Sequence, residues 1–336
     1  MPLRDVVGHT RMVGLLARAI ARDTLPPSLL LAGPSGVGKR RVAVGVAAAI
    51  NCLSPQHGEL ERDGCGTCTS CLRIARGVHP DVIVIVPGDT GTIKTEPIRE
   101  VIAASGFRPF EGRRRVVVVD EADALVVPAQ NALLKTLEEP PSASIFLLVS
   151  SMPDSLLATV RSRCPRLRFG PLSVAEVADV LVRDHGFSAA DARVAADASD
   201  GSIGGALALQ SADLQGARDA AATLLRQAAR GADPVRRLEA AKALAPPKGS
   251  PASDREQLAA CLRAMSSLLR DLGIMASRVD TGALANADLA GELEALSRSY
   301  DAKRSVKAHS AVDRALAALE RNASPKVVAD WLVLEL

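Results

Sequence analysis

The chain has 336 residues, of which 48% are hydrophobic and 24% charged, so it is long and apolar enough for two or three folded domains. The formal net charge of +3 is nearly balanced and does not by itself indicate nucleic-acid binding. No apolar run approaches the ~18 residues that a membrane-spanning helix needs, and the first residues lack a signal core. We therefore expect a cytoplasmic protein with no membrane partner.

A glycine-rich segment follows the first apolar run, Leu29–Ala32. It reads Gly33-Pro34-Ser35-Gly36-Val37-Gly38-Lys39-Arg40, and residues 41–50 after it have a helical pattern. A strand, a glycine-rich turn and a helix form the setting of a phosphate-binding loop, where backbone N–H groups and the helix N-terminus hold phosphate oxygens. The pattern predicts the following nucleotide-binding residues in this loop: Gly33, Gly36, Gly38, Lys39 and Arg40.

The last residue of this loop departs from the motif. Arg40 stands where a serine or threonine would supply a hydroxyl ligand to magnesium, and a guanidinium group cannot ligate a metal ion. Lys39 keeps the point charge for the phosphates. We therefore expect a weakened site, and whether ATP and Mg²⁺ bind there stays open.

Runs of β-branched residues predict three further buried strands, at residues 82–86, 115–119 and 145–149. Helical patterns alternate with them, which predicts a parallel α/β sheet with its functional groups at the carboxyl ends of the strands. Asp120 and Glu121 follow the second of these strands, where a Walker B motif holds magnesium and polarises the attacking water. Ser150 ends the third strand, and its hydroxyl is a further candidate nucleotide-binding group at this edge of the sheet. A solvated strand end is the competing interpretation for the two acids.

Four cysteines have the spacing of a metal site. Cys52, Cys65, Cys68 and Cys71 form C-x12-C-x2-C-x2-C, which brings four thiolates to one tetrahedral ion. We predict structural Zn²⁺, with an iron–sulfur cluster or free thiols as the alternatives. His57 lies in the same insert and is interpreted as a loop residue.

The pattern after Gly170 is entirely helical. Ser173 and Glu176 form a capping box, Ser188 caps a second helix, and a third helix follows Ser202. A further capping box, Ser253 to Glu256, predicts a helix start in the C-terminal part. We divide the chain into a nucleotide-binding-type domain with the zinc module, a helical lid and a helical oligomerisation domain. Their predicted bounds are 1–170 with the module at 52–71, 171–211 and 212–336.

Together these motifs resemble the AAA+ clamp-loader ATPases of DNA replication. Residues 5–9 are similar to the family's adenine-side segment, and Asn131–Pro141 to the signature after Walker B. Ser162-Arg163-Cys164 is similar to the motif whose arginine reaches a neighbouring subunit's ATP. The cysteine insert is similar to that of the bacterial DNA polymerase III subunits. The resemblance implies an AAA+ sheet domain, a helical lid and a helical collar through which five subunits form a ring.

Two departures indicate which kind of subunit this is. ATP-hydrolysing gamma/tau-type subunits pair lysine with threonine or serine in the loop, and their lid carries an arginine two residues after a Gly-Ser pair. Here the positions are Arg40 and Gly204. Both departures are similar to the delta-prime type, the stator of the loader. The resemblance then places function in Arg163, an arginine finger that acts in trans on a neighbouring ATPase site, and leaves Glu121 vestigial.

The implied partners are gamma/tau and delta subunits in a hetero-pentameric ring, with the sliding clamp and primed DNA reached through that complex. The chain would be part of the DNA polymerase III holoenzyme without being a polymerase itself, and at most a weak ATPase. One alternative is a gamma/tau-type ATPase that uses Lys39, Asp120 and Glu121 for its own hydrolysis. Another is a free-standing zinc-containing DNA-binding protein, which the near-neutral charge and the scarcity of aromatic residues disfavour.

Overall fold

The computed structural model describes residues 2–88, 90–211, 214–229, 234–244, 251–276, 284, 286, 289–320 and 323–336. The chain divides into two compact units. The first contains Met1–Glu176 with Gly201–Gly204, and the second contains Val177–Asp200 with Gly205–Leu336. The predicted three-domain division with boundaries at 170 and 211 stays a prediction. No helix in the described residues is long and apolar enough to cross a membrane.

The first unit is built on a sheet in which every pairing between strands is parallel, in the order β2-β3-β4-β1-β5. The strands are β1 (Ser28–Ala32), β2 (Val82–Ile85), β3 (Arg115–Val119), β4 (Ser144–Ser150) and β5 (Arg166–Arg168). Every residue of β1, β3 and β4 is buried, as continuous apolar runs predict. The predicted parallel α/β sheet is confirmed.

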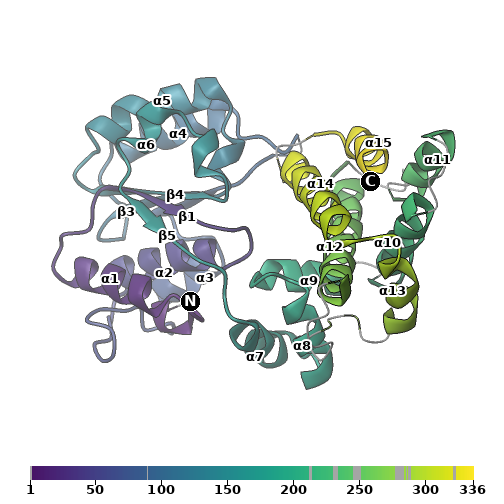
Figure 1. Ribbon diagram of the computed structural model, residues 1–336. Helices are drawn as coiled ribbons and strands as arrows, with labels where there is room; N and C mark the ends of the chain where they lie inside the picture. The colour runs from purple at the N-terminus through teal and green to yellow at the C-terminus, as the bar shows by residue number, and fades with distance from the viewer. Residues whose placement is uncertain are drawn as a thin grey trace. The chain divides into compact units, whose positions relative to one another are not determined.

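Helices cover both faces of this sheet (Figure 1). One face packs Leu29, Val116 and Leu147 against α1, α2 and α3, and the other packs Leu30, Val117 and Phe146 against α4, α5 and α6. The helices of this unit are α1 (Thr10–Ala21), α2 (Lys39–Asn51), α3 (Thr69–Ala75), α4 (Thr95–Ser105), α5 (Val127–Glu138) and α6 (Ala158–Arg161). Because both faces are buried, polar groups of the sheet are confined to the ends of its strands.

The second unit is helical throughout its described residues. Its core is mostly aliphatic and includes the buried Tyr300, whose hydroxyl donates to the Leu225 carbonyl at 3.4 Å. The helices that follow the sheet are α7 (Val174–His185), α8 (Ala189–Asp197), α9 (Ile203–Ser211), α10 (Leu214–Ala229), α11 (Pro234–Leu244), α12 (Pro251–Ala276), α13 (Ala290–Ser297), α14 (Ala302–Glu320) and α15 (Pro325–Glu335).

Helix capping follows the predictions in two places and differs in a third. Glu176 bonds the backbone and hydroxyl of Ser173, and the Ser188 hydroxyl accepts from the Asp191 backbone, so both predicted caps are confirmed. The predicted helix start at Ser253 is wrong, because α12 already begins at Pro251. Proline suits that first position, since its fixed φ matches the helix and its missing N–H would have no helical partner.

A buried ion pair holds the segment that enters β3. Asp81 is fully buried, and its carboxylate accepts from Arg115 Nη2 at 3.0 Å and from the backbone N–H groups of Phe110, Glu111 and Gly112 at 2.7–2.8 Å. Burial alone would raise the pKa of Asp81, but these bonds outweigh it and keep the pKa below its ordinary value. Arg115 is therefore a buried structural residue, held by Asp81.

We expect Asp81→Asn to destabilise the first unit by about 3 kcal/mol at pH 7, because it leaves the Arg115 charge buried without its counter-ion. The folded pKa of Asp81 is lowered, so its ionisation contributes stability above the unfolded pKa and loses it as pH falls through the folded value. Urea unfolding at pH 7, 5 and 3 should show a difference between variant and wild type that shrinks at the lowest pH.

The matched control is Asp154→Asn, which removes an exposed partner of Arg161 and should change the unfolding free energy by less than about 0.5 kcal/mol. An Asp81→Asn effect as small as that of the control, or one independent of pH, would contradict this account.

Candidate functional site

The phosphate loop joins the end of β1 to the first turn of α2. Gly36 and Gly38 have φ values of 73° and 100°, in the left-handed region that favours glycine, so the loop can turn its backbone as the motif requires. The loop is tied to the sheet by the Gly33 backbone N–H, which donates to the Ser150 carbonyl at 3.2 Å. The structure thus brings Gly33, Gly36 and Gly38 together with Ser150 at the carboxyl ends of β1 and β4.

Lys39 is turned onto its own loop. Its side chain is buried, and Nζ donates to the carbonyl oxygens of Gly33 at 2.7 Å and Pro34 at 2.6 Å. A lysine ammonium has three donors, so these two bonds already occupy most of its capacity. A bound phosphate would have to replace them.

Arg40 forms an ion pair with Asp120, the predicted Walker B aspartate. Arg40 Nη1 lies 3.2 Å from Asp120 Oδ2, at the end of β3 where a magnesium ion would need that carboxylate. Burial raises the pKa of Asp120 above its ordinary value, while the charges of Arg40 and Lys39 favour its ionised form. The guanidinium group therefore supplies the positive charge that a metal ion supplies in an ATPase site.

Glu121 occupies the next position in a left-handed backbone conformation, with φ of 49°. Burial, followed by the neighbouring charges of Asp120 and Asp123, raises the pKa of its carboxyl. Asp123 has a defined partner in this structure, since it accepts from the Ser151 backbone N–H at 3.0 Å. Ser150, which precedes Ser151 in the chain, is buried, and its hydroxyl is without a hydrogen-bond partner among the described residues.

The start of α9 and the residue before it, Ser202, pack directly on the phosphate loop. The Ser202 hydroxyl donates to the Ser35 carbonyl at 2.8 Å, and the Gly204 backbone N–H donates to the Gly36 carbonyl at 3.1 Å. A Cβ added at Gly204 would lie 2.9 Å from the Gly36 Cα. The sequence showed only that an arginine is missing at position 204, whereas the structure shows that no side chain fits there without moving the loop.

Arg163 lies apart from these groups, after α6. Its Nη1 donates to the Thr159 carbonyl at 2.7 Å, and its Nη2 forms an ion pair with Glu138, in the last turn of α5. The Arg163 side chain is 28% exposed and that of Glu138 is 56% exposed. Cys164 beside it is buried, which raises the pKa of its thiol to about 11. Arg163 thus sits near the surface with an acidic partner from its own chain.

The four cysteines of the insert converge on one point. Their Sγ atoms all lie within 4.8 Å of one another, and those of Cys52 and Cys68 are 3.8 Å apart. A tetrahedral zinc ion with Zn–S distances of ~2.3 Å requires S–S edges of about 3.8 Å, so the geometry fits such an ion. His57 is exposed, contacts the Glu61 carbonyl and lies outside this group.

Backbone N–H groups surround the sulfur atoms, as a site for thiolates requires. The N–H of Cys65 points to Cys52 Sγ and that of Cys68 to Cys65 Sγ, each at 3.2 Å. The Thr67 hydroxyl donates to Cys65 Sγ at 3.6 Å, and this bond contributes most to lowering the pKa of the Cys65 thiol to about 6. The residues present therefore suit a divalent metal ion held by four thiolates.

The insert also anchors the start of the chain. The Asp63 carboxylate accepts from the Leu3 backbone N–H at 2.7 Å and pairs with Arg4 Nη1 at 3.1 Å, and Arg4 also bonds the Gly64 carbonyl. Sequence reasoning did not identify these residues. A metal ion in the four-cysteine site would thus stabilise the insert, the end of α2 and the N-terminal segment together.

Comparison with known proteins finds similarity to subunits of DNA polymerase III. A family profile described as "DNA polymerase III, delta subunit" matches residues 8–173. The DNA polymerase III subunit delta' of Pseudomonas aeruginosa is 39% identical over 136 residues, which are 40% of this chain and 40% of that protein. Subunit delta' of Bacillus subtilis is 33% identical over 172 residues, 51% of this chain and 50% of that protein. Subunit tau/gamma of Haemophilus influenzae is 34% identical over 177 residues, 53% of this chain and 25% of that protein.

The chain thus spans half or less of the length of these relatives. Among solved structures, a gamma subunit-related protein from Thermotoga maritima is 17% identical with a TM-score of 0.42, covering 95% of this chain and 96% of that one. The RuvB Holliday junction branch migration motor of the same organism is 18% identical with a TM-score of 0.41, covering 90% of each chain. Residues 8–173 of this chain thus match the DNA polymerase III delta subunit family, and they are similar to its delta' and tau/gamma subunits.

Proposed function

We propose that this chain is a delta'-type stator of a clamp loader, which turns over no ATP itself and completes the ATPase site of a neighbouring subunit with Arg163. Its partners in this proposal are gamma/tau-type and delta subunits in a five-membered ring, and it takes part in loading the sliding clamp onto primed DNA through that ring. The relatives described above are all DNA polymerase III subunits, which supports this assignment.

The ion pair between Arg40 and Asp120 is the observation that carries the proposal. Phosphoryl transfer in P-loop enzymes depends on a magnesium ion held by the loop hydroxyl and the Walker B aspartate. This chain has no hydroxyl at that position, and its aspartate already has a cationic partner. The bonds from Lys39 to its own loop and the close packing of Gly204 on Gly36 support the same conclusion.

The chemistry and position of Arg163 support the proposal that this residue acts on the ATPase site of a neighbouring subunit. A guanidinium group is always charged and matches phosphate oxygens with two parallel hydrogen bonds. Arg163 is held through an ion pair with Glu138, at a partly exposed position and near the surface. Exposed ion pairs contribute only about 0–1 kcal/mol, so a neighbour's triphosphate can replace Glu138 at low cost.

We further propose that the four-cysteine site holds one zinc ion. With four protein ligands the ion has no open position, so it would stabilise the fold and take no part in a reaction. The ion would supply the charge that lets Cys52, Cys65, Cys68 and Cys71 lie together as thiolates within the S–S distances observed.

Arg163→Ala should reduce ATP hydrolysis at the site that it serves by about 10³-fold, because an arginine finger contributes at least that much to phosphoryl transfer. The measurement is clamp- and DNA-stimulated ATPase activity of the complex reconstituted with each variant. Arg161→Ala is the matched control, since Arg161 lies two residues away and forms its own exposed ion pair with Asp154.

The control should hydrolyse ATP like wild type, and both variants should assemble into the complex. Normal ATPase activity with Arg163→Ala would exclude the finger. If the isolated wild-type chain hydrolysed ATP robustly and Lys39→Ala abolished that activity, the result would instead favour a gamma/tau-type ATPase.

Arg40→Thr should create Mg²⁺-dependent nucleotide binding, because it frees the Asp120 carboxylate and restores a hydroxyl ligand. We expect affinity for a fluorescent ATP analogue to rise at least tenfold with magnesium and to fall again with EDTA. Turnover should stay negligible, because the lid still lacks an arginine at position 204. The control Arg40→Lys keeps a cation in the loop and should bind the analogue like wild type. Equal affinities of wild type, Arg40→Thr and Arg40→Lys would contradict the proposal that Arg40 prevents magnesium-dependent binding.

The purified chain should contain one equivalent of zinc, and Cys71→Ser should lose it. Loss of the metal should destabilise the first unit by more than about 2 kcal/mol, or roughly 5 °C in the thermal midpoint of a domain of this size. Metal analysis and thermal unfolding before and after chelation measure both effects. Cys261→Ala, in the core of the second unit, should keep its zinc, and a metal-free wild type with unchanged stability would rule out the site.

A further inference from the structure

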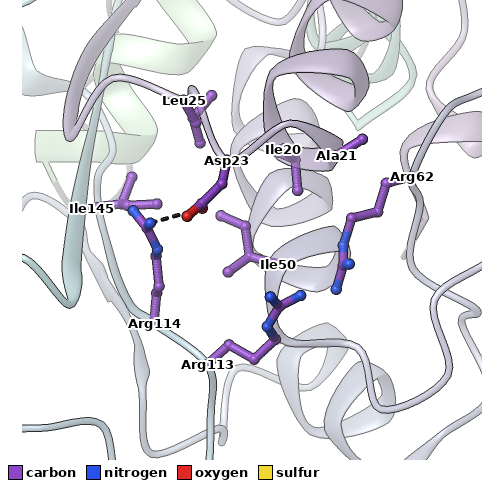
Figure 2. Close-up of a pocket in the computed structure, with 9 residues that line it drawn as sticks. All are labelled: Ile20, Ala21, Asp23, Leu25, Ile50, Arg62, Arg113, Arg114 and Ile145. Carbon is purple, nitrogen blue, oxygen red and sulfur yellow. Dashed lines mark hydrogen bonds and ion pairs between the residues drawn. The ribbon is translucent and has the colours of Figure 1, made fainter.

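A second charged site lies in the first unit, at the opposite ends of the strands from the phosphate loop. Arg113 and Arg114 precede β3, and Ile145 lies near the start of β4, whereas the phosphate loop follows the end of β1. With Arg62 of the cysteine insert they line a pocket of about 190 Å³ (Figure 2). Ile20 and Ile50, at the ends of α1 and α2, add an aliphatic wall.

Positive charge exceeds negative charge in this pocket. Asp23 is the one acidic residue that lines it, and its carboxylate pairs with Arg114 Nη2 at 2.8 Å. Arg62 Nε donates to the Ala49 carbonyl at 3.0 Å, and Arg113 has no hydrogen bond or ion pair within the described part of the chain. Figure 2 shows the guanidinium groups of Arg62 and Arg113 turned toward one another. Three arginines and one aspartate leave two positive charges uncompensated.

The surroundings of Arg62 disfavour its positive charge. Burial, followed by the nearby charge of Arg113, lowers the pKa of the Arg62 guanidinium. A bound anion would offset both effects. It would accept hydrogen bonds in place of the water that burial excludes, and its negative charge would reduce the repulsion between Arg62 and Arg113.

The backbone of Arg114 is held in place by bonds within the chain. Asn51 is buried and forms two hydrogen bonds with the backbone of Arg114. Asn51 Nδ2 donates to the Arg114 carbonyl at 3.0 Å, and the Arg114 N–H donates to Asn51 Oδ1 at 3.1 Å. The next residue, Arg115, is fixed by Asp81. Because the backbone is fixed on both sides of Arg114, a ligand would need to order only the outer parts of the side chains, which favours binding.

We propose that this pocket binds a phosphomonoester group, the terminal phosphate of a nucleotide or of a DNA strand. A phosphomonoester carries about two negative charges at pH 7 and three strong acceptor oxygens, which match two uncompensated guanidinium groups. A phosphodiester carries one charge and matches less well. The aliphatic wall accommodates the adjoining sugar, and Asp23 disfavours more highly charged anions by repulsion. This site is separate from the proposed action of Arg163.

The test uses the full chain with Lys39→Ala in every sample, so that the phosphate loop does not contribute to binding. Inorganic phosphate and adenosine monophosphate are titrated by calorimetry. Two single-stranded oligonucleotides of one sequence, one with a 5′-phosphate and one with a 5′-hydroxyl, are titrated by fluorescence anisotropy. Stronger binding of the 5′-phosphorylated strand than of adenosine monophosphate identifies a DNA end as the source, and the reverse order identifies a free nucleotide.

We expect Arg113→Ala and Arg62→Ala each to weaken phosphate binding about tenfold, because each removes one charge-assisted contact. Asp23→Asn should strengthen it severalfold, since it removes the one negative charge and asparagine tolerates the left-handed backbone at that position, where φ is 54°. Arg99→Ala, on the exposed face of α4, is the matched control and should bind like its parent.

Arg113 has no partner within the described residues, so its removal should leave the unfolding midpoint unchanged and separate binding from folding. No saturable phosphate binding, or equal binding by Arg113→Ala and Arg99→Ala, overturns the proposal.

Discussion

The buried carboxylate of Asp120 needs a counter-charge, and the identity of that counter-charge determines what the phosphate loop can do. In a P-loop ATPase a magnesium ion supplies it, so the site is complete only when metal and nucleotide are bound. Here Arg40, a residue of the loop itself, lies 3.2 Å away and supplies it from within the chain. Lys39 likewise bonds carbonyls of its own loop. The loop therefore forms a stable arrangement without any ligand.

The same sheet explains why charged groups gather at two separate places. Its central strands are buried on both faces, so ionisable side chains lie beyond the strand ends. Asp120 follows the end of β3, and Arg115, paired with the buried Asp81, begins it. Strand β3 is thus followed at its carboxyl end by Asp120, which contacts the phosphate loop. At its amino end it is preceded by the basic residues Arg113 and Arg114, where Asn51 holds the backbone of Arg114.

Much of the fold could be predicted from the sequence because the central strands are continuous apolar runs and the phosphate loop is a local motif. The strand β5 was missed, since Arg166-Leu167-Arg168 is short and has a single apolar residue. Local patterns also could not show that Arg115 is buried, because its partner Asp81 is 34 residues away. The cysteine spacing predicted the cluster of four sulfur atoms, but the packing of Gly204 against Gly36 depends on residues 168 positions apart and required the structure.

Under the proposed function, the ion pair between Arg163 and Glu138 bears on how the action of Arg163 on a neighbouring subunit could be switched. Glu138 lies in the last turn of α5, the helix of the signature that follows the Walker B motif. In an isolated chain the carboxylate holds the guanidinium group on its own surface and limits its rotamers. In the proposed complex, a neighbouring subunit with bound triphosphate would offer more negative charge than one carboxylate, so the exchange would become favourable only when that neighbour holds nucleotide. The internal acid would then make the action of Arg163 conditional on the nucleotide state of the partner.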